Sequence, residues 1–71
     1  MAMKRSDLSR LIVGRADVTG RDVTVTQGAR HEKWLVGATR ITVPRHREIN
    51  ELTARSILKH LEAEFGKEWW R

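Results

Sequence analysis

The chain has no cysteine, no tyrosine, a single proline and no long hydrophobic run. Without cysteine it cannot form a disulfide, a zinc–thiolate site or a thiol nucleophile, and it suits a reducing cytoplasm. The longest apolar run, Leu11-Ile12-Val13, is too short to cross a bilayer, and no apolar region of a signal peptide follows Lys4 and Arg5. We therefore expect a cytoplasmic protein that does not associate with membranes.

Enclosed cofactor sites and metal sites are also disfavoured. The 71 residues suit a single domain, 1–71, whose small core leaves little room for a deep pocket. His31, His46 and His60 are scattered and form no His-x₃-His pair, so we predict no metal site and no cofactor. Glycine-rich phosphate loops and nucleophile elbows are missing as well. A surface site that acts on a bound polymer remains compatible with this sequence.

Positive charge is concentrated in the middle of the chain. The formal net charge is +5, and residues 48–71 nearly balance their charges. Residues 30–47 contain only one acid, Glu32, against the cations Arg30, Lys33, Arg40, Arg45 and Arg47. This distribution predicts an anion-binding face, with nucleic acid as the expected ligand and a merely solvated surface as the alternative.

Hydrophobic periodicity predicts two helices around three strands. Ser6 can cap a short first helix that Gly14 ends, and residues 15–21 then form a connection. Residues 22–27, 31–36 and 39–43 alternate as strands do. Gly28 turns the chain between the first two strands, Gly37-Ala38 suits a type II′ hairpin turn, and Pro44 ends the sheet.

Asn50 can cap a longer second helix that Gly66 ends, leaving a tail of residues 67–71. The apolar positions of this helix are spaced as on one helical face: Ala54, Ile57, Leu58, Leu61 and Phe65. We expect at least one of Trp69 and Trp70 to fold back onto the core. The order is α-β-β-β-α, which predicts a two-layer α+β sandwich with both helices on one face of an antiparallel sheet.

Strand alternation separates a core face of the sheet from an open face. Burying Trp34 with Val36 removes more apolar area from water than burying Leu35 alone, so we expect that pair to face the core. The other inward positions follow from the same alternation: Val23, Val25, Thr39, Ile41 and Val43. His31, Lys33 and Arg40 then point to the open face.

His31 is the candidate catalytic residue, within the stretch Gly28-Ala29-Arg30-His31-Glu32-Lys33-Trp34. Histidine exchanges protons near neutral pH, and the neighbouring Arg30 and Lys33 can hold a phosphodiester. RNA carries its own nucleophile, the 2′-hydroxyl. A second basic cluster, Arg45-His46-Arg47, is expected to position the substrate, and His46 could instead serve as a partner acid or base. The alternative is that His31 is an exposed strand residue without a role.

These segments resemble the HicA family of small bacterial toxins. The resemblance runs from Lys4-Arg5-Ser6-Asp7-Leu8 to Ile57-Leu58-Lys59-His60-Leu61. Its most specific parts are the Gly-x-x-His start of the second strand, Gly28 to His31, and the run from Thr42-Val43-Pro44-Arg45 to Ala54-Arg55-Ser56-Ile57. Arg30-His31-Glu32-Lys33-Trp34 resembles a branch of the family in which a tryptophan follows the catalytic histidine. The common form of the histidine motif is Gly-Ser-His, whereas here two residues separate Gly28 from His31.

The resemblance implies a fold related to double-stranded-RNA-binding domains. It also implies ribonuclease activity on messenger RNA, with His31 as the catalytic histidine and a HicB-type antitoxin as the neutralising partner. Two alternatives stay open: an RNA-binding module or inactive HicA relative without catalysis, and a regulatory protein that uses the Trp69-Trp70 tail. RNA cleavage preference and oligomeric state do not follow from the sequence.

Overall fold

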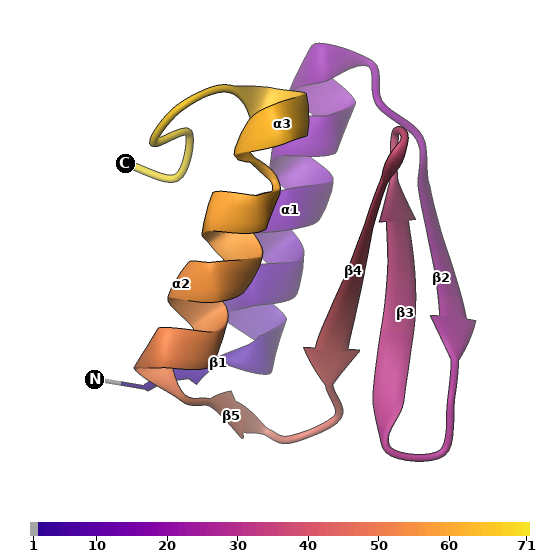
Figure 1. Cartoon of the computed structure of the whole chain (residues 1–71), viewed down its shortest axis with the longest axis vertical. Helices are drawn as coiled ribbons and strands as arrows, with labels where there is room; N and C mark the ends of the chain where they lie inside the picture. The colour runs from indigo at the N-terminus through magenta and orange to yellow at the C-terminus, as the bar shows by residue number, and fades with distance from the viewer. Residues whose placement is uncertain (1) are drawn as a thin grey trace.

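The computed structural model describes residues 2–71 (Figure 1). Its elements in chain order are β1 (Met3–Lys4), α1 (Arg5–Thr19), β2 (Val23–Gln27), β3 (His31–Val36), β4 (Thr39–Pro44), β5 (Glu48–Ile49), α2 (Glu51–His60) and α3 (Glu62–Phe65). β2, β3 and β4 form an antiparallel sheet in that order, and β1 pairs separately with β5. A small α+β fold, with one helix before the three-stranded sheet and one after it, is thus confirmed, and the β1–β5 pair is an addition.

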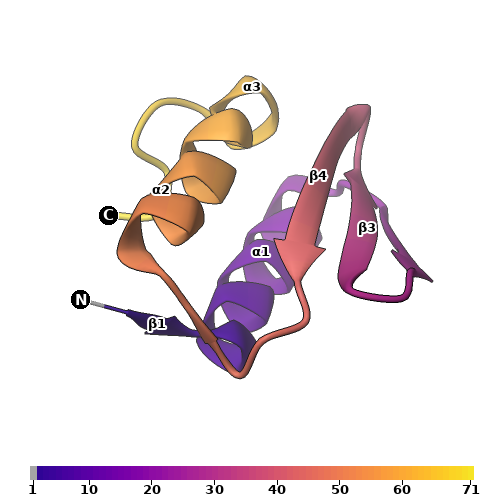
Figure 2. The same ribbon diagram turned by 60° about the horizontal axis from the view of Figure 1, so that its bottom comes forward.

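α1 and α2 lie on the same side of the sheet, nearer to β4 than to β2 (Figures 1 and 2). The predicted inward positions Trp34, Val36, Ile41 and Val43 are buried, and Thr39 is half-buried. They pack in one cluster with side chains from both helices, among them Leu8, Ile12, Ala54, Ile57 and Leu58. The choice of Trp34 over Leu35 as the inward residue is therefore confirmed.

The first helix is longer than predicted. It begins at Arg5, runs through Gly14 and ends at Thr19, where Gly20 adopts a left-handed conformation with φ 70°. The predicted cap at Ser6 and stop at Gly14 are wrong, and of the predicted connection over 15–21 only residues 20 and 21 lie outside the helix. Leu8, Ile12 and Ala16 continue one buried stripe past the glycine. Their burial outweighs the roughly 1 kcal/mol that glycine costs inside a helix.

β2 is less covered than the sequence predicted. Val23 is half-buried, but Val25 is 41% exposed although it lies opposite Trp34 on the core face. Strand alternation identified the face correctly, and the predicted burial of Val25 is wrong. The reason is that β2 is an edge strand, farthest from the helices in Figure 1.

The second helical segment follows the prediction closely. The Asn50 side chain accepts a hydrogen bond from the Leu52 backbone N–H at 2.8 Å, which confirms the cap. The helix is interrupted at Leu61 and resumes as α3, and Gly66 with φ 97° ends it. Trp69 folds back as expected. It is 7% exposed, its indole N–H donates to the Leu58 carbonyl at 2.8 Å, and its ring meets Phe65 edge-on.

The β3–β4 turn is fixed by an acid from α3. Gly37 has φ 59° and Ala38 has a negative φ, as a type II′ turn requires. Glu64 accepts hydrogen bonds from the Ala38 backbone N–H at 2.8 Å and from the Thr39 hydroxyl at 2.9 Å, and it pairs with Arg21. This turn is therefore anchored to the helix layer.

Candidate functional site

His31 is the first residue of β3, and its side chain is exposed on the face of the sheet that the helices do not cover. Exposure alternates strictly along β3, with Glu32, Trp34 and Val36 buried and the residues between them exposed. The predicted outward orientation of His31 and Lys33 is confirmed. The imidazole of His31 has no hydrogen-bond partner among residues 2–71.

The turn before His31 depends on a close backbone approach at Gly28. The Gly28 N–H donates to the His31 carbonyl at 2.9 Å. A Cβ at position 28 would come within 2.8 Å of that carbonyl oxygen, which is closer than real contacts allow. Gly28 therefore closes the turn because a side chain has no room there, and not because its backbone is left-handed.

Arg45 ties the same turn to the end of β4. Its backbone N–H donates to the Arg30 carbonyl at 3.2 Å, and its guanidinium Nη1 donates to the Gly28 carbonyl at 3.1 Å. His31 lies opposite Pro44 in the β3–β4 register, so the three groups share one end of the sheet. Arg45, predicted only as a substrate contact, thus also holds the turn that carries His31.

Glu32 is the buried neighbour of His31, and sequence patterns did not single it out. It is 4% exposed, forms an ion pair with Arg5 of α1, and accepts a hydrogen bond from the Trp34 indole at 3.4 Å. The Arg5 hydrogen bond holds the pKa of Glu32 below its ordinary value against the opposing effect of burial. This ion pair therefore links the start of α1 to the end of β3 that carries His31.

The burial of Glu32 has a consequence for the surface. It is the only acid within residues 30–47, and the cations of that segment are all exposed. The open face therefore presents positive charge without a compensating exposed carboxylate from the same segment. A charge count along the sequence could suggest this excess, but only the fold shows that the acid faces inward.

Lys33 and Arg40 lie farther along the open face than His31. They line a shallow depression of about 460 Å³ together with Leu35 and the threonines Thr24, Thr26 and Thr42. Arg40 lies opposite Leu35, four residues along β4 from Pro44, the partner of His31. At about 3.3 Å per residue the backbones at His31 and Arg40 are roughly 13 Å apart. The threonine hydroxyls were not predicted, although the alternation that places Val23 inward places Thr24 and Thr26 outward.

His46 and Arg47 lie in the exposed segment between β4 and β5. The Arg47 carbonyl accepts a hydrogen bond from the Arg5 backbone N–H at 2.9 Å, which attaches this segment to the start of α1. The structure thus brings Arg30, His31 and Arg45 together at one end of the sheet. Lys33 and Arg40 form a second group at its middle, and His46 and Arg47 follow in the neighbouring segment.

Within residues 2–71, no three His, Asp or Glu side chains are grouped so that they could hold a metal ion. The same residues contain no helix with the length and apolar character needed to cross a bilayer. In comparisons with known proteins, no family model, no curated protein and no solved structure matches this chain.

Proposed function

We propose that this protein is a metal-independent endoribonuclease of the toxin type, which cleaves messenger RNA on the open face of its sheet. The observation that carries the proposal is the exposed His31 beside exposed Arg30 and Lys33, with Glu32, the one acid of this segment, buried against Arg5. A polyanion would meet a histidine and cations there and no exposed carboxylate of that segment. The HicA resemblance of the same residues supports this function.

The proposed cleavage needs few protein groups, because RNA supplies its own nucleophile. The 2′-hydroxyl of RNA attacks the adjacent phosphorus, the bond to the 5′-oxygen of the next nucleotide breaks, and a 2′,3′-cyclic phosphate forms. His31 moves a proton as general acid or base, while Arg30 and Lys33 hold the phosphate and stabilise its developing charge. The cationic surface along which the RNA strand lies continues over Lys33, Arg40, Arg45 and Arg47. His46 is a further contact.

The proposal includes a partner and a fold relationship. An acidic protein of the HicB antitoxin type would cover His31, and opposite surface potentials would make its association fast and sensitive to salt. The helix order and the open sheet face are compatible with a fold related to double-stranded-RNA-binding domains.

The test is cleavage of a labelled RNA by the full chain in the presence of EDTA. We expect activity to persist and the products to end in a 2′,3′-cyclic phosphate or its hydrolysis product. Cleavage that requires a divalent ion at unchanged RNA structure, or products with 3′-hydroxyl ends, would contradict the mechanism because an activated water would then be the nucleophile.

A specific observation favours a second candidate, an RNA-binding module without catalysis. General acids and bases are usually oriented by a neighbouring hydrogen bond, and the His31 imidazole receives none within residues 2–71. The discriminating result is RNA binding with strong salt dependence but no cleavage by the purified protein.

A further inference from the structure

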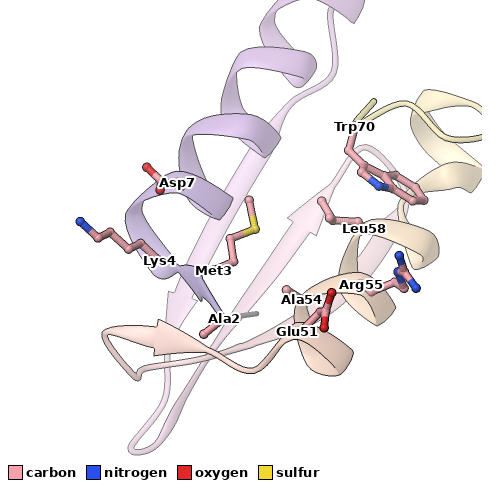
Figure 3. Close-up of a pocket in the computed structure, with 9 residues that line it drawn as sticks. All are labelled: Ala2, Met3, Lys4, Asp7, Glu51, Ala54, Arg55, Leu58 and Trp70. Atoms are coloured by element: carbon pink, nitrogen blue, oxygen red, sulfur yellow. The ribbon is translucent and has the colours of Figure 1, made fainter.

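A groove runs along the helix layer, away from the open sheet face. One section, of about 480 Å³, lies between the start of α1 and α2, where Met3, Leu58 and Trp70 approach one another (Figure 3). A second section, of about 360 Å³, lies between the middle of α1 and the last residues of the chain. Trp70 lines both sections, so they are adjacent, and together we call them the α1 groove.

The α1 wall of this groove is a single helical face. Asp7, Leu11, Gly14 and Val18 line it at spacings of i, i+4, i+7 and i+11. Leu11 is 37% exposed and Val18 is 78% exposed. From Asp7 to Val18 the stripe covers twelve residues, or about 16 Å of helix. Its apolar part, from Leu11 to Val18, is about two turns long, and residues 2–71 leave it partly exposed.

Gly14 occupies the centre of that face without a reason inside the fold. Glycine in a helix interior is less stable than alanine. A Cβ at position 14 would meet no atom of residues 2–71 within 4 Å, so no steric contact among these residues demands a glycine. Glycine does permit another backbone to approach closely. This points to a partner chain that crosses α1 at Gly14.

The charges around the groove indicate the chemistry of that partner. The first section has two cations, Lys4 and Arg55, and two acids, Asp7 and Glu51, in its lining. The second section is lined by Arg10, Arg15 and Arg71 and by no acid, so the excess of positive charge lies there. The ion pairs Arg10–Asp7 at 3.9 Å and Arg71–Glu68 at 3.7 Å are long and exposed, so they neutralise little of this charge. A second copy of this chain would bring a net charge of +5 against these arginines. The arginines therefore favour an acidic partner over a second copy of this basic chain.

We infer that the α1 groove binds an acidic amphipathic helix of a partner protein. About two turns of that helix place apolar side chains against Leu11, Val18 and Trp70, and its backbone crosses closest at Gly14. Its carboxylates meet Arg10, Arg15 and Arg71. Helix-in-groove recognition uses this combination of an apolar stripe and flanking charge. The groove does not include His31, so the inference is independent of the ribonuclease proposal.

The experiment uses the full chain and two designed helical peptides of about 14 residues, a length set by the groove. One peptide has a leucine stripe with glutamates on its polar face, and the other has the same stripe with lysines. Fluorescence anisotropy measures their binding. We expect the acidic peptide to bind at least about tenfold more tightly than the basic one. A scrambled acidic peptide without the stripe should bind as weakly as the basic one.

Three variants locate the site. Gly14→Leu should weaken acidic-peptide binding by about tenfold or more, and Arg15→Glu should do the same, whereas Arg40→Glu on the open sheet face should leave it unchanged. Gly14→Ala should raise the melting temperature, because alanine favours the helix, and yet weaken binding. A higher melting temperature together with weaker peptide binding would show that Gly14 serves docking and not the stability of the fold.

The inference is overturned if the acidic peptide does not bind, binds equally to the Gly14→Leu protein, or is lost with Arg40→Glu. It is also overturned if duplex RNA displaces the bound peptide and fails to bind the Arg15→Glu protein, since the groove would then be a nucleic-acid surface.

Discussion

The two ends of the three-stranded sheet are held by side chains of opposite charge. At the Gly37 end, the carboxylate of Glu64 accepts hydrogen bonds from the turn and pairs with Arg21. At the Gly28 end, the guanidinium of Arg45 donates to the turn. Figure 1 places these turns at opposite ends of β3, with the Gly28 end also carrying His31.

The difference bears on the proposed function, which needs a sheet that is anchored and also attracts an anion. A carboxylate anchor neutralises a cation and fixes its turn to the helix layer. A guanidinium anchor uses a donor on a carbonyl and keeps its positive charge, so the turn is fixed without losing its attraction for phosphate. In the proposed ribonuclease, stability and RNA binding are thus assigned to different ends of the same strands.

The largest expected effect is at His31. His31→Ala should lower the rate of RNA cleavage by about 10²- to 10⁴-fold, the usual contribution of a general acid or base. The melting temperature should not change, because the side chain is exposed and outside the core. His60→Ala, an exposed change on α2, is the matched control. Equal cleavage by wild type and His31→Ala would remove His31 from the mechanism and make His46 the next candidate.

The next effect concerns the middle of the open face. Replacing Lys33 and Arg40 together by glutamine should weaken all RNA sequences alike. It should reduce the log–log salt slope by roughly 1.4, since each phosphate contact to a single strand contributes about 0.7. Binding titrations at several salt concentrations measure this. Lys59→Gln with Lys67→Gln, outside residues 30–47, is the control pair, and equal losses from both pairs would show that the cluster is only solvated surface.

A pair of glycine substitutions compares the two turns directly. Gly28→Ala brings a methyl group against the His31 carbonyl, and Gly37→Ala forces a side chain into a left-handed backbone. Each should destabilise the protein by about 1–2 kcal/mol in urea unfolding. Only Gly28→Ala should also reduce cleavage, measured below both unfolding transitions, because it moves the strand that carries His31. Equal activity losses would mean that the ends of the sheet are not functionally distinct.

The smallest effect is a dependence of stability on acid at the Gly37 end. Hydrogen bonds from the Ala38 N–H and the Thr39 hydroxyl hold the pKa of Glu64 below its ordinary value of 4.5, with a further contribution from Arg21. A carboxyl whose folded pKa is lowered stabilises the protein above the unfolded pKa, and this stability is lost as the pH falls below it. We expect the melting temperature to fall between about pH 5 and pH 3.

In Glu64→Gln this acid-induced fall should be smaller, although Glu32 leaves a residual dependence through its own lowered pKa. Thermal unfolding followed by circular dichroism measures it. Glu48→Gln, an exposed change on β5, should keep the full wild-type fall. A Glu64→Gln protein with an unchanged pH profile would contradict the assigned anchor.

Strand alternation and capping were sufficient to predict most of the fold. The pairing of Trp34 with the core, the Asn50 cap and the fold-back of Trp69 each follow from local rules of periodicity or hydrogen bonding. The extent of α1 does not, because Gly14 is a local stop signal that the buried stripe through Ala16 overrides. The two-residue β1–β5 pairing carries no local signal either, since it arises only when the fold brings Met3 beside Ile49.

The sequence predicted which way the side chain of His31 points, but not the residues that hold its strand and turn in place. Alternation alone places His31 outward once Trp34 is inward. A run of charged residues, in contrast, does not reveal which of its members is buried. The burial of Glu32 and its ion pair with Arg5 therefore could not be predicted from the sequence. Arg45 was expected to contact RNA for its charge, whereas its bond to the Gly28 carbonyl depends on the spatial closeness of the turn to the end of β4.

The folded-back Trp69 has an optical consequence. The chain has three tryptophans and no tyrosine, so no tyrosine contributes to its near-ultraviolet emission. Trp34 reports from the sheet and Trp69 from the helix layer, and both are shielded from water. Proteins that retain Trp34 alone or Trp69 alone of the three tryptophans would show by their emission spectra whether the two layers unfold at the same denaturant concentration, without any added label.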